Sequence, residues 1–407
     1  MKMTTTDSVS SGSGCPCCAF RMDMFLPESE RDQEEPDEDG HENDTQLSVE
    51  ADTAAVDIQA TVPALLLSQQ QQQQQHDDDN KPSPVVIVDT HCHAQLDRER
   101  DVTYDLGSCC SEEEDNNVAT FSNNDTSLRL QQLACAVEPS NFQETLDYAS
   151  TSDTILPALG IHPWYIPSII SSEESIEEED KEDSKWLQRL EELLIQHPTA
   201  IVGEIGLCKI AKWTRHFEQG KAAAMQIQLK VMKQQLKLAA KLHRPVSVHC
   251  VNAHGLFVKA LKELAVENND NNNHDTIPPS IGMHSFTGTA HHVKELLDLE
   301  DRVLRRHWHV KNHIDGNNPP PLFYFGFSHA VNYAMCSSEK SRKKGMEAAR
   351  AVPMERLMVE SDVHHPDDVL GGTIGAIAYV AAARNVSPIE IANVTAKNGV
   401  AFFMQRG

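Results

Sequence analysis

The sequence predicts an α/β fold, an eight-stranded (β/α)8 barrel of the TIM type preceded by a disordered acidic tail. Three observations predict it. From residue 85 onward, short apolar runs alternate with longer stretches of helical periodicity. There are eight such runs, and side chains that bind metals stand at the ends of five of them. Apolar strands that alternate with helices form parallel sheets, and eight such strands can close into a barrel.

The first 84 residues differ from the rest in composition. They hold 18 acids and four bases, and they include a glutamine run at 69–75. Such a segment cannot bury enough apolar surface to offset the entropy lost on ordering, so we expect disorder over 1–84. Its apolar patch at 62–67 is too short for a domain and is either a docking peptide for a protein partner or unused tail.

The net charge of -26 argues at first against a nucleic-acid partner, because polyanions are held mainly by neutralising their phosphates. Most of that charge lies in the tail and in acidic runs at 112–115 and 173–183. The part of 85–407 outside these two runs is therefore nearly neutral, and a nucleic-acid substrate stays possible.

Each predicted strand is a short apolar run that stops at a polar or glycine-containing segment. The eight runs are 85–88, 133–137, 155–159, 200–202, 245–248, 281–283, 322–327 and 357–359. Helical spacing of apolar residues predicts helices between or after them. The clearest are one from residue 141, one at 185–195, a long one ending near 242, and two at 373–384 and 388–403.

Four polar stretches look like insertions into this barrel. They are 98–127, 171–183, 268–277 and 300–320. Without them, the body is close to the ~250 residues that this fold usually needs. The weakest part of the prediction is the first helix, because nothing in 98–132 has a clear helical pattern.

Neither a membrane segment nor a secretory signal is expected. No apolar run approaches the ~20 residues that a membrane helix needs, and the first residues lack an apolar stretch. The ten cysteines are therefore expected to be reduced, in a cytoplasmic or nuclear protein.

Six side chains of metal-binding type follow the predicted strands. They are His91, His93, Glu204, His249, His284 and Asp362. The carboxyl ends of parallel barrel strands meet on one face, and side-chain alternation points the first two histidines the same way. Four imidazoles and two carboxylates on one rim suit one or two divalent metal ions.

The same segments carry a resemblance to a known family. They read Asp-Thr-His-Cys-His at 89–93, Gly-Ile-His-Pro at 160–163, Gly-Glu-Ile-Gly-Leu at 203–207, Pro-Val-Ser-Val-His at 245–249, His-Ser-Phe-Thr-Gly at 284–288 and Glu-Ser-Asp at 360–362. In this order they resemble the TatD family of metal-dependent deoxyribonucleases, in the amidohydrolase superfamily, over essentially 85–407. The segments around 163–164 and 325–328 look closer to the fungal-type branch than to the bacterial one.

The resemblance implies that the six side chains are metal ligands and that the reaction is hydrolysis of DNA phosphodiester bonds. It implies two ions (Mg²⁺, Mn²⁺ or Zn²⁺) bridged by Glu204, which would activate a water molecule. In this scheme His91, His93 and Asp362 hold one ion, and the other two histidines hold the second. Asp362 would also act as general base, so the catalytic residues are Asp362 and Glu204.

Several positions depart from the family pattern. Cys208 stands where the family usually has aspartate, and Lys209-Ile210 stands where an aromatic pair is usual. Val251 replaces a bacterial arginine, and Val363-His364-His365 replaces a Ser-Pro-Tyr segment. The set of metal ligands is complete, whereas the contacts to the substrate are left open.

Five further residues are candidates for those contacts. His162 either binds a phosphate oxygen or is structural, and Trp164 either stacks on a base or packs on the rim. Lys209, Lys212 and Arg215 either bind phosphates or belong to a solvated loop. The acidic insertion at 171–183 is expected on the same face, where it would weaken the binding of long polyanions.

Three functions are therefore compatible with the sequence. The first is a metal-dependent deoxyribonuclease. The second is a hydrolase of the same superfamily that acts on a small C–N, ester or phosphate substrate, because fold alone does not determine substrate. The third is a protein-interaction factor without catalysis, for which the long tail would provide the contact.

Overall fold

The computed structural model describes the barrel and few residues before it. The described residues are 61, 64–65, 85–96, 102–104, 110–112, 118–121, 127–170, 184–270, 276–304, 321–336 and 338–404. The predicted tail and insertions therefore lie largely outside the described residues, including the acidic run at 171–183. Within the tail segment, residues 61, 64 and 65 are helical, and Leu65 is fully buried in the main hydrophobic core.

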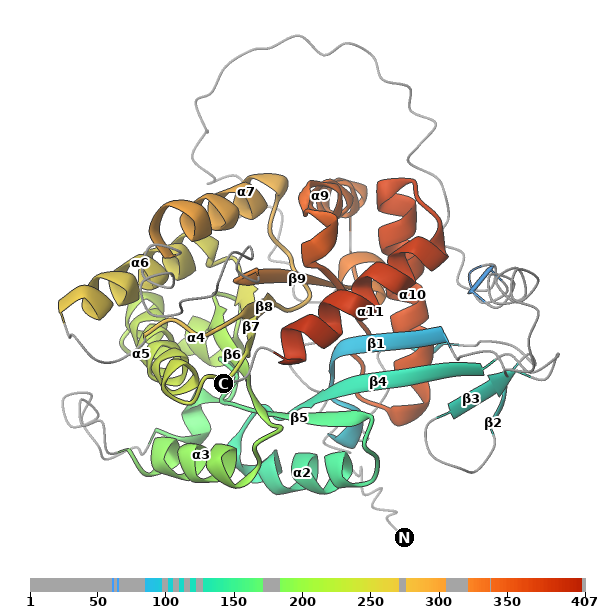
Figure 1. Ribbon diagram of the computed structural model, residues 1–407. Coiled ribbons are helices and arrows are strands. Elements are labelled where there is room, and N and C mark those ends of the chain that lie inside the picture. Colours follow the sequence, from blue (N-terminus) through green and yellow to red (C-terminus); the bar gives the residue numbers. More distant parts are fainter. Residues whose placement is uncertain are drawn as a thin grey trace, which may run out of the picture.

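Eight parallel strands form the barrel, as the sequence predicts (Figure 1). They are β1 (Val85–Cys92), β4 (Ser127–Cys135), β5 (Ile155–Leu159), β6 (Ile201–Cys208), β7 (Val246–Val251), β8 (Ile281–Met283), β9 (Phe323–Ser328) and β10 (Leu357–Glu360). Each pairs with the next in this order. Beyond the strand ends, β10 and β1 are joined by backbone hydrogen bonds from His93 N to Val363 O (2.8 Å) and from Asp362 N to His91 O (3.0 Å).

Four strands, β1, β4, β6 and β7, are clearly longer than predicted. The β1 strand continues to Cys92, so His91 lies inside it and not after it. The β7 strand continues to Val251, so His249 also lies inside its strand and not after it.

The β6 strand continues through Glu204 to Cys208, so this glutamate lies inside the strand and not after it. The continuation depends on Gly206, whose φ is 144° and where a Cβ atom would collide with the backbone oxygen of His249. The β4 strand begins at Ser127 because a short antiparallel strand pairs with its first residues.

That short strand belongs to a hairpin in the first predicted insertion. It consists of β2 (Cys110–Glu112) and β3 (Val118–Phe121), beside β4 in Figure 1. In the described residues between β1 and β4, the only helical element is the 3-10 turn η4 (Ala94–Leu96).

Helices surround the strands in Figure 1. They are α2 (Phe142–Ser150), α3 (Lys185–Gln196), α4 (Lys212–His216), α5 (Lys221–Lys241), α6 (His254–Asp270), α7 (Ala290–Leu299), α9 (Glu339–Ala351), α10 (Pro366–Arg384) and α11 (Pro388–Met404). Shorter helical elements are η6 (Pro139–Asn141), η7 (Ile166–Ser168), η9 (Glu300–Leu304), η10 (Ala330–Ala334) and η11 (Met354–Arg356).

Two helix predictions need correction. The long helix expected after the fourth strand is split into α4 and α5, because Phe217 is extended and Gly220 has a φ of 89°. The helix expected from residue 373 begins at Pro366. Proline suits the first position of a helix, and the ring nitrogen of His365 caps it by accepting from Asp367 N (3.3 Å).

The last helix, α11, packs against β1 and β10. Its Phe402 and Phe403 join Tyr324, Met358 and other strand residues in a second apolar cluster, separate from the main core between strands and outer helices. Asn398 Nδ2 donates to the backbone oxygens of Met354 (2.7 Å) and Leu357 (2.8 Å), where β10 starts. The helix therefore covers the amino end of the barrel.

In the described part of the chain, no helix by itself has the length and apolar character to cross a bilayer. Only α10 and α11 taken together reach that length and apolarity, and they are bent by 113° relative to each other.

Candidate metal centre

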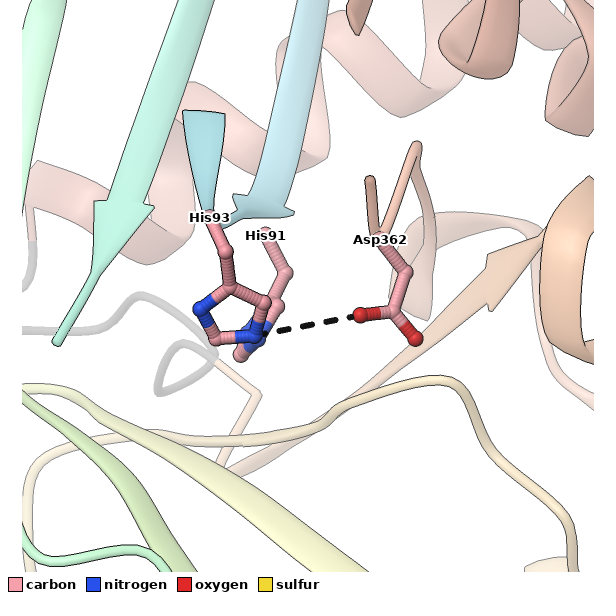
Figure 2. Close-up of side chains that lie close together, drawn as sticks. All are labelled: His91, His93 and Asp362. Atoms are coloured by element: carbon pink, nitrogen blue, oxygen red, sulfur yellow. Dashed lines mark hydrogen bonds and ion pairs between the residues drawn. The ribbon is translucent and has the colours of Figure 1, made fainter. Parts of the chain in front are cut away.

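The metal centre begins at the end of β1. The pairing of β1 with β4 shifts between Asp89 and Cys92; His91 lies within this irregularity, and His93 comes directly after the strand. Figure 2 shows both imidazoles on the same side of the chain, pointing toward Asp362. Nε2 of His93 lies 3.2 Å from Nε2 of His91 and 3.9 Å from Oδ1 of Asp362. All three side chains are buried.

Each of these imidazoles is oriented through its other nitrogen. Nδ1 of His93 donates to the backbone oxygen of Cys135 (2.8 Å), and Nδ1 of His91 is hydrogen-bonded to the hydroxyl of Ser247 on β7 (2.9 Å). Such outer contacts fix the ring and leave Nε2 facing the centre. The two strands adjacent to and across from β1 therefore set the direction of its ligands.

Glu204 lies at the middle of the cluster. Its Oε1 is 2.9 Å from Nδ1 of His249, 3.3 Å from Nε2 of His162 and 3.4 Å from Nε2 of His284. Its Oε2 lies 3.5 Å from Nε2 of both His91 and His93. One carboxylate thus faces five imidazoles.

The opposite wall is formed by residues after β8 and β10. Nδ1 of His284 donates to Oε1 of Glu360 (2.8 Å), and the hydroxyl of Ser285 donates to Oδ2 of Asp362 (2.9 Å). Ser285 and Asp362 have φ values of 35° and 55°. This left-handed conformation costs a non-glycine residue about 1–3 kcal/mol and is found mostly at functional sites.

The donor atoms fit a metal ion. Nε2 of His162, Nε2 of His249 and Oε2 of Glu204 are buried and form no hydrogen bond. Buried polar atoms in proteins normally have a partner, so three such atoms in one cluster fit the binding of a cation. Three sets of side chains come close enough to share an ion: His91–His93–Asp362, His91–Glu204–His284 and His162–Glu204–His249.

The charges of the cluster agree with this at His91, His162 and Glu204. Burial, followed by the charge on His284, lowers the pKa of His91 to about 3, and burial lowers that of His162 to about 4. Burial alone would raise the pKa of Glu204, but the surrounding imidazoles hold it well below its ordinary value. The two histidines are therefore neutral and the glutamate ionised, which are the forms that bind a metal.

His249 and His284 differ from these residues. Against the effect of burial, Cys208 and Glu204 raise the pKa of His249 to about 10, and Asp362 and Glu204 raise the pKa of His284 to about 9. Both imidazoles must therefore lose a proton to bind an ion.

The structure brings all six predicted ligands together and adds His162, which is fully buried beside Glu204. Trp164 is half-buried, and its backbone N–H donates to Nδ1 of His162 (3.2 Å). Lys209 is exposed directly after β6, whereas Lys212 and Arg215 are exposed on α4.

Sequence reasoning missed the residues that orient the ligands. They are Asp89, Ser247, Ser285 and Glu360, all buried. Asp89 accepts from the backbone N–H of His91 (2.9 Å) and from the hydroxyl of Thr373 (2.9 Å). Asp89 and Glu360 each stand two residues before a predicted ligand, and this spacing was the available signal. Burial raises the pKa of Asp89 to about 7, against the effect of these hydrogen bonds.

Fold and site together define a class, the barrel hydrolases built around a metal centre. More specifically, the chain belongs to the TatD related DNase family, whose model matches residues 88–404. It is thus a metal-dependent hydrolase of that family, as the sequence motifs predict.

Individual relatives are distant. The Cut9-interacting protein scn1 of Schizosaccharomyces pombe is 24% identical, with 53% of this chain and 73% of that protein covered. It is a fungal protein, in agreement with the expected branch. The uncharacterized metal-dependent hydrolase YabD of Bacillus subtilis is also 24% identical, with 62% and 78% covered. The human 3'-5' RNA nuclease TATDN2 is 26% identical, with 52% of this chain but 20% of that protein covered.

Among solved structures, an uncharacterized amidohydrolase from Saccharomyces cerevisiae is similar with a TM-score of 0.49 and 15% identity. The match covers 67% of this chain and 89% of that one.

Proposed function

We propose that the protein is a nuclease that hydrolyses phosphodiester bonds of DNA with the help of two divalent metal ions. The observation that carries the proposal is the buried cluster around Glu204, with its three unpaired donor atoms, at the carboxyl end of the barrel strands. Relatives named as nucleases support a nucleic-acid substrate. A divalent ion in such a cluster lowers the pKa of a water molecule and stabilises charge on phosphate oxygens.

The ligands divide into two groups that share Glu204. His91, His93 and Asp362 would hold one ion. His162, His249 and His284 surround the other side of the glutamate and would hold the second. Imidazole and carboxylate donors suit Zn²⁺ or Mn²⁺, and Mg²⁺ is the third candidate.

Asp362 is the proposed general base. Its Oδ2 accepts from the Ser285 hydroxyl, which is itself hydrogen-bonded to the hydroxyl of Ser328 (2.7 Å). This contact fixes the carboxylate while its Oδ1 lies 3.9 Å from Nε2 of His93. The carboxylate held in this way would take the proton of the attacking water, because a general base must lie within hydrogen-bond reach of the proton that it removes.

The test is a cleavage assay on the purified protein, stripped of metal and reloaded with Mg²⁺, Mn²⁺ or Zn²⁺. Substrates are single-stranded DNA, double-stranded DNA and RNA, beside an Asp362→Asn variant. The proposal expects metal-dependent cleavage of DNA that is lost in the variant. Cleavage of RNA but not of DNA would show that the substrate is RNA. Tight metal binding without cleavage of either would contradict a nuclease and favour a small substrate.

Two further parts of the proposal concern the cell. The five cysteines that the structure describes form no disulfide, which is consistent with a reducing compartment such as the cytoplasm or nucleus.

A protein partner bound through the tail is the second candidate function, because one relative is named for an interaction with another protein. A pull-down that compares the full chain with one lacking residues 1–60 and one lacking residues 1–84 tests it, and equal recovery of partners by all three would contradict it.

A further inference from the structure

A cavity of 640 Å³ opens on the carboxyl face of the barrel, outside the metal cluster. It lies between the segments that follow β6, β7, β8 and β9 and the first turns of α9. Its polar lining includes Lys209, Asn252, His254, Thr287, His292 and Lys344. We call this cavity the basic groove. Its volume lies within the roughly 300–1,000 Å³ of sites that bind small molecules or parts of polymers.

The basic groove is continuous with the catalytic machinery along the chain. Asn252 stands three residues after His249, and Thr287 stands three residues after His284. Another lining residue, Asn332, accepts from the backbone N–H of Ser328 (2.9 Å). Ser328 in turn bonds the serine that fixes Asp362. A polymer whose scissile bond lies at the metal centre would therefore pass into this groove.

The electrostatics of the groove favour an anion. Two exposed lysines, Lys209 and Lys344, line it, and none of the described residues that line it is acidic. Three helices, α6, α7 and α9, begin at its edge, and helix N-termini carry partial positive charge with unsatisfied N–H groups. Two acids stand near these helix starts, Glu295 on α7 and Glu339 in the first turn of α9, and neither lines the groove.

The groove also contains a flat pair of imidazoles. The rings of His254 and His292 are stacked, with centroids 4.4 Å apart and planes inclined by 10°. His254 is packed edge-on against Phe286, and its buried Nε2 forms no hydrogen bond. Nδ1 of His292 accepts from the backbone N–H of Thr289 (3.1 Å), which fixes the second ring. Half-buried, His292 presents a rigid aromatic surface, and nucleobases stack on such surfaces.

We infer that the basic groove binds the nucleotide next to the scissile bond of a single-stranded nucleic acid. Its phosphate lies between Lys209 and Lys344, and its base rests on the pair formed by His254 and His292. This inference rests on the proposed nuclease function and specifies the substrate as a polynucleotide of at least two residues. Of the three lysine and arginine contacts expected from the sequence, it selects Lys209 and adds Lys344.

The first test is kinetic, with the metal-loaded protein. Lys344→Ala and Lys209→Ala are compared with Lys343→Ala, an exposed lysine of α9 that does not line the groove. Substrates are a single-stranded 12-residue oligonucleotide and bis(p-nitrophenyl) phosphate, which carries no flanking nucleotide. A charged hydrogen bond to phosphate predicts that each lining variant lowers the ratio of kcat/KM, oligonucleotide over small substrate, by about tenfold. The control variant leaves the ratio unchanged.

The second test measures binding without turnover. Fluorescence anisotropy of a labelled oligothymidylate is recorded with metal-free protein over a range of salt concentrations. Each lining variant should weaken binding and reduce the slope of log K against log salt by about 0.7, the value for one lost phosphate contact to a single strand. His292→Ala should weaken binding severalfold relative to His291→Ala, and an abasic site at one position of the oligonucleotide should remove that difference.

The outcomes separate the two proposals. If Lys209→Ala and Lys344→Ala behave like Lys343→Ala in both assays, the basic groove does not hold the nucleic acid and the inference is wrong. If they lose activity equally on both substrates, their role is structural, which also overturns it. If the unmodified protein hydrolyses only the small diester, the nuclease proposal fails, while the binding assay still decides whether the groove holds a polynucleotide.

Discussion

The two halves of the barrel interior are built by the same strands but differ in chemistry. Toward the amino end, the strands supply an apolar cluster that includes Val88, Leu133 and Met358, closed by Phe402 of α11. Toward the carboxyl end, two residues further along β10, Glu360 is the partner of His284. Met358 and Glu360 thus lie only two residues apart on one strand. The first belongs to a packed apolar core and the second to a site held together by hydrogen bonds and charge. The apolar half supplies stability, and the polar half holds unpaired donors in place.

The largest effect is expected from breaking the polar half at its centre. Glu204→Gln removes the charge that faces five imidazoles, so bound metal should fall to background. Hydrolysis of bis(p-nitrophenyl) phosphate should drop about 10³-fold, because a metal ion contributes several kcal/mol of charge stabilisation. Metal content by mass spectrometry and initial rates check this. Glu218→Gln, at an exposed position before α5, is the control, and retained metal in Glu204→Gln would contradict the bridging role.

The next effect concerns the apolar half. Phe402 is 1% exposed and packs beside Tyr324, with ring centroids 5.6 Å apart. Phe402→Ala should lower the free energy of unfolding by about 3–5 kcal/mol, the usual cost of such a cavity. The folded variant should still bind metal. Urea unfolding measures the loss beside Val400→Ala, which is 40% exposed on the same helix and should change stability by no more than about 0.5 kcal/mol.

A smaller effect is expected one layer outside the ligands. Glu360 accepts hydrogen bonds from Nδ1 of His284, from the backbone N–H of Ser285 and from the hydroxyl of Thr90. Glu360→Gln should reduce metal affinity by about 10–100-fold, as loss of an orienting contact usually does. Competition with a chromophoric chelator measures it, with Glu347→Gln on the surface of α9 as the matched change. Equal affinities would show that Glu360 does not orient the ligand.

The smallest effect is expected at His254 in the basic groove, and it concerns the pH dependence of stability. Burial lowers the pKa of His254 to about 4, while the unfolded side chain titrates near 6.5. As pH falls through this window the unfolded chain takes up a proton that the folded chain does not, so stability is lost between about 6.5 and 4. His254→Asn should reduce that loss by on the order of 1 kcal/mol.

Urea unfolding at several pH values measures this difference, with His291→Asn as the control because that histidine is exposed. The ligand histidines titrate alike in both proteins and cancel from the comparison. Identical pH profiles for His254→Asn and the unmodified protein would exclude His254 as a source of the loss.

Most of the barrel could be predicted because both faces of a parallel strand are buried, which leaves clear apolar runs in the sequence. The split between α4 and α5 could not be predicted, because the turn at Gly220 depends on a positive φ, and a single glycine in the sequence does not indicate which φ it adopts. The six candidate ligands were predictable from their place after the apolar runs of the sequence, although three of them lie inside the strands of the structure. Ser247 and the stacked pair of the basic groove were not, because a lone serine or histidine becomes informative only when distant strands bring its partner beside it.

The two backbone hydrogen bonds that join β1 to the residues after β10 have a consequence for folding during protein synthesis. His91 is synthesised early, but its neighbour across the closure, Asp362, leaves the ribosome about 270 residues later. A growing chain that has not yet reached Asp362 cannot assemble the centre, so hydrolysis cannot begin before that residue has been made. Contacts of such long sequence separation also form slowly. The hydrogen bonds that complete the barrel therefore make the centre depend on synthesis of the chain as far as Asp362 and Val363.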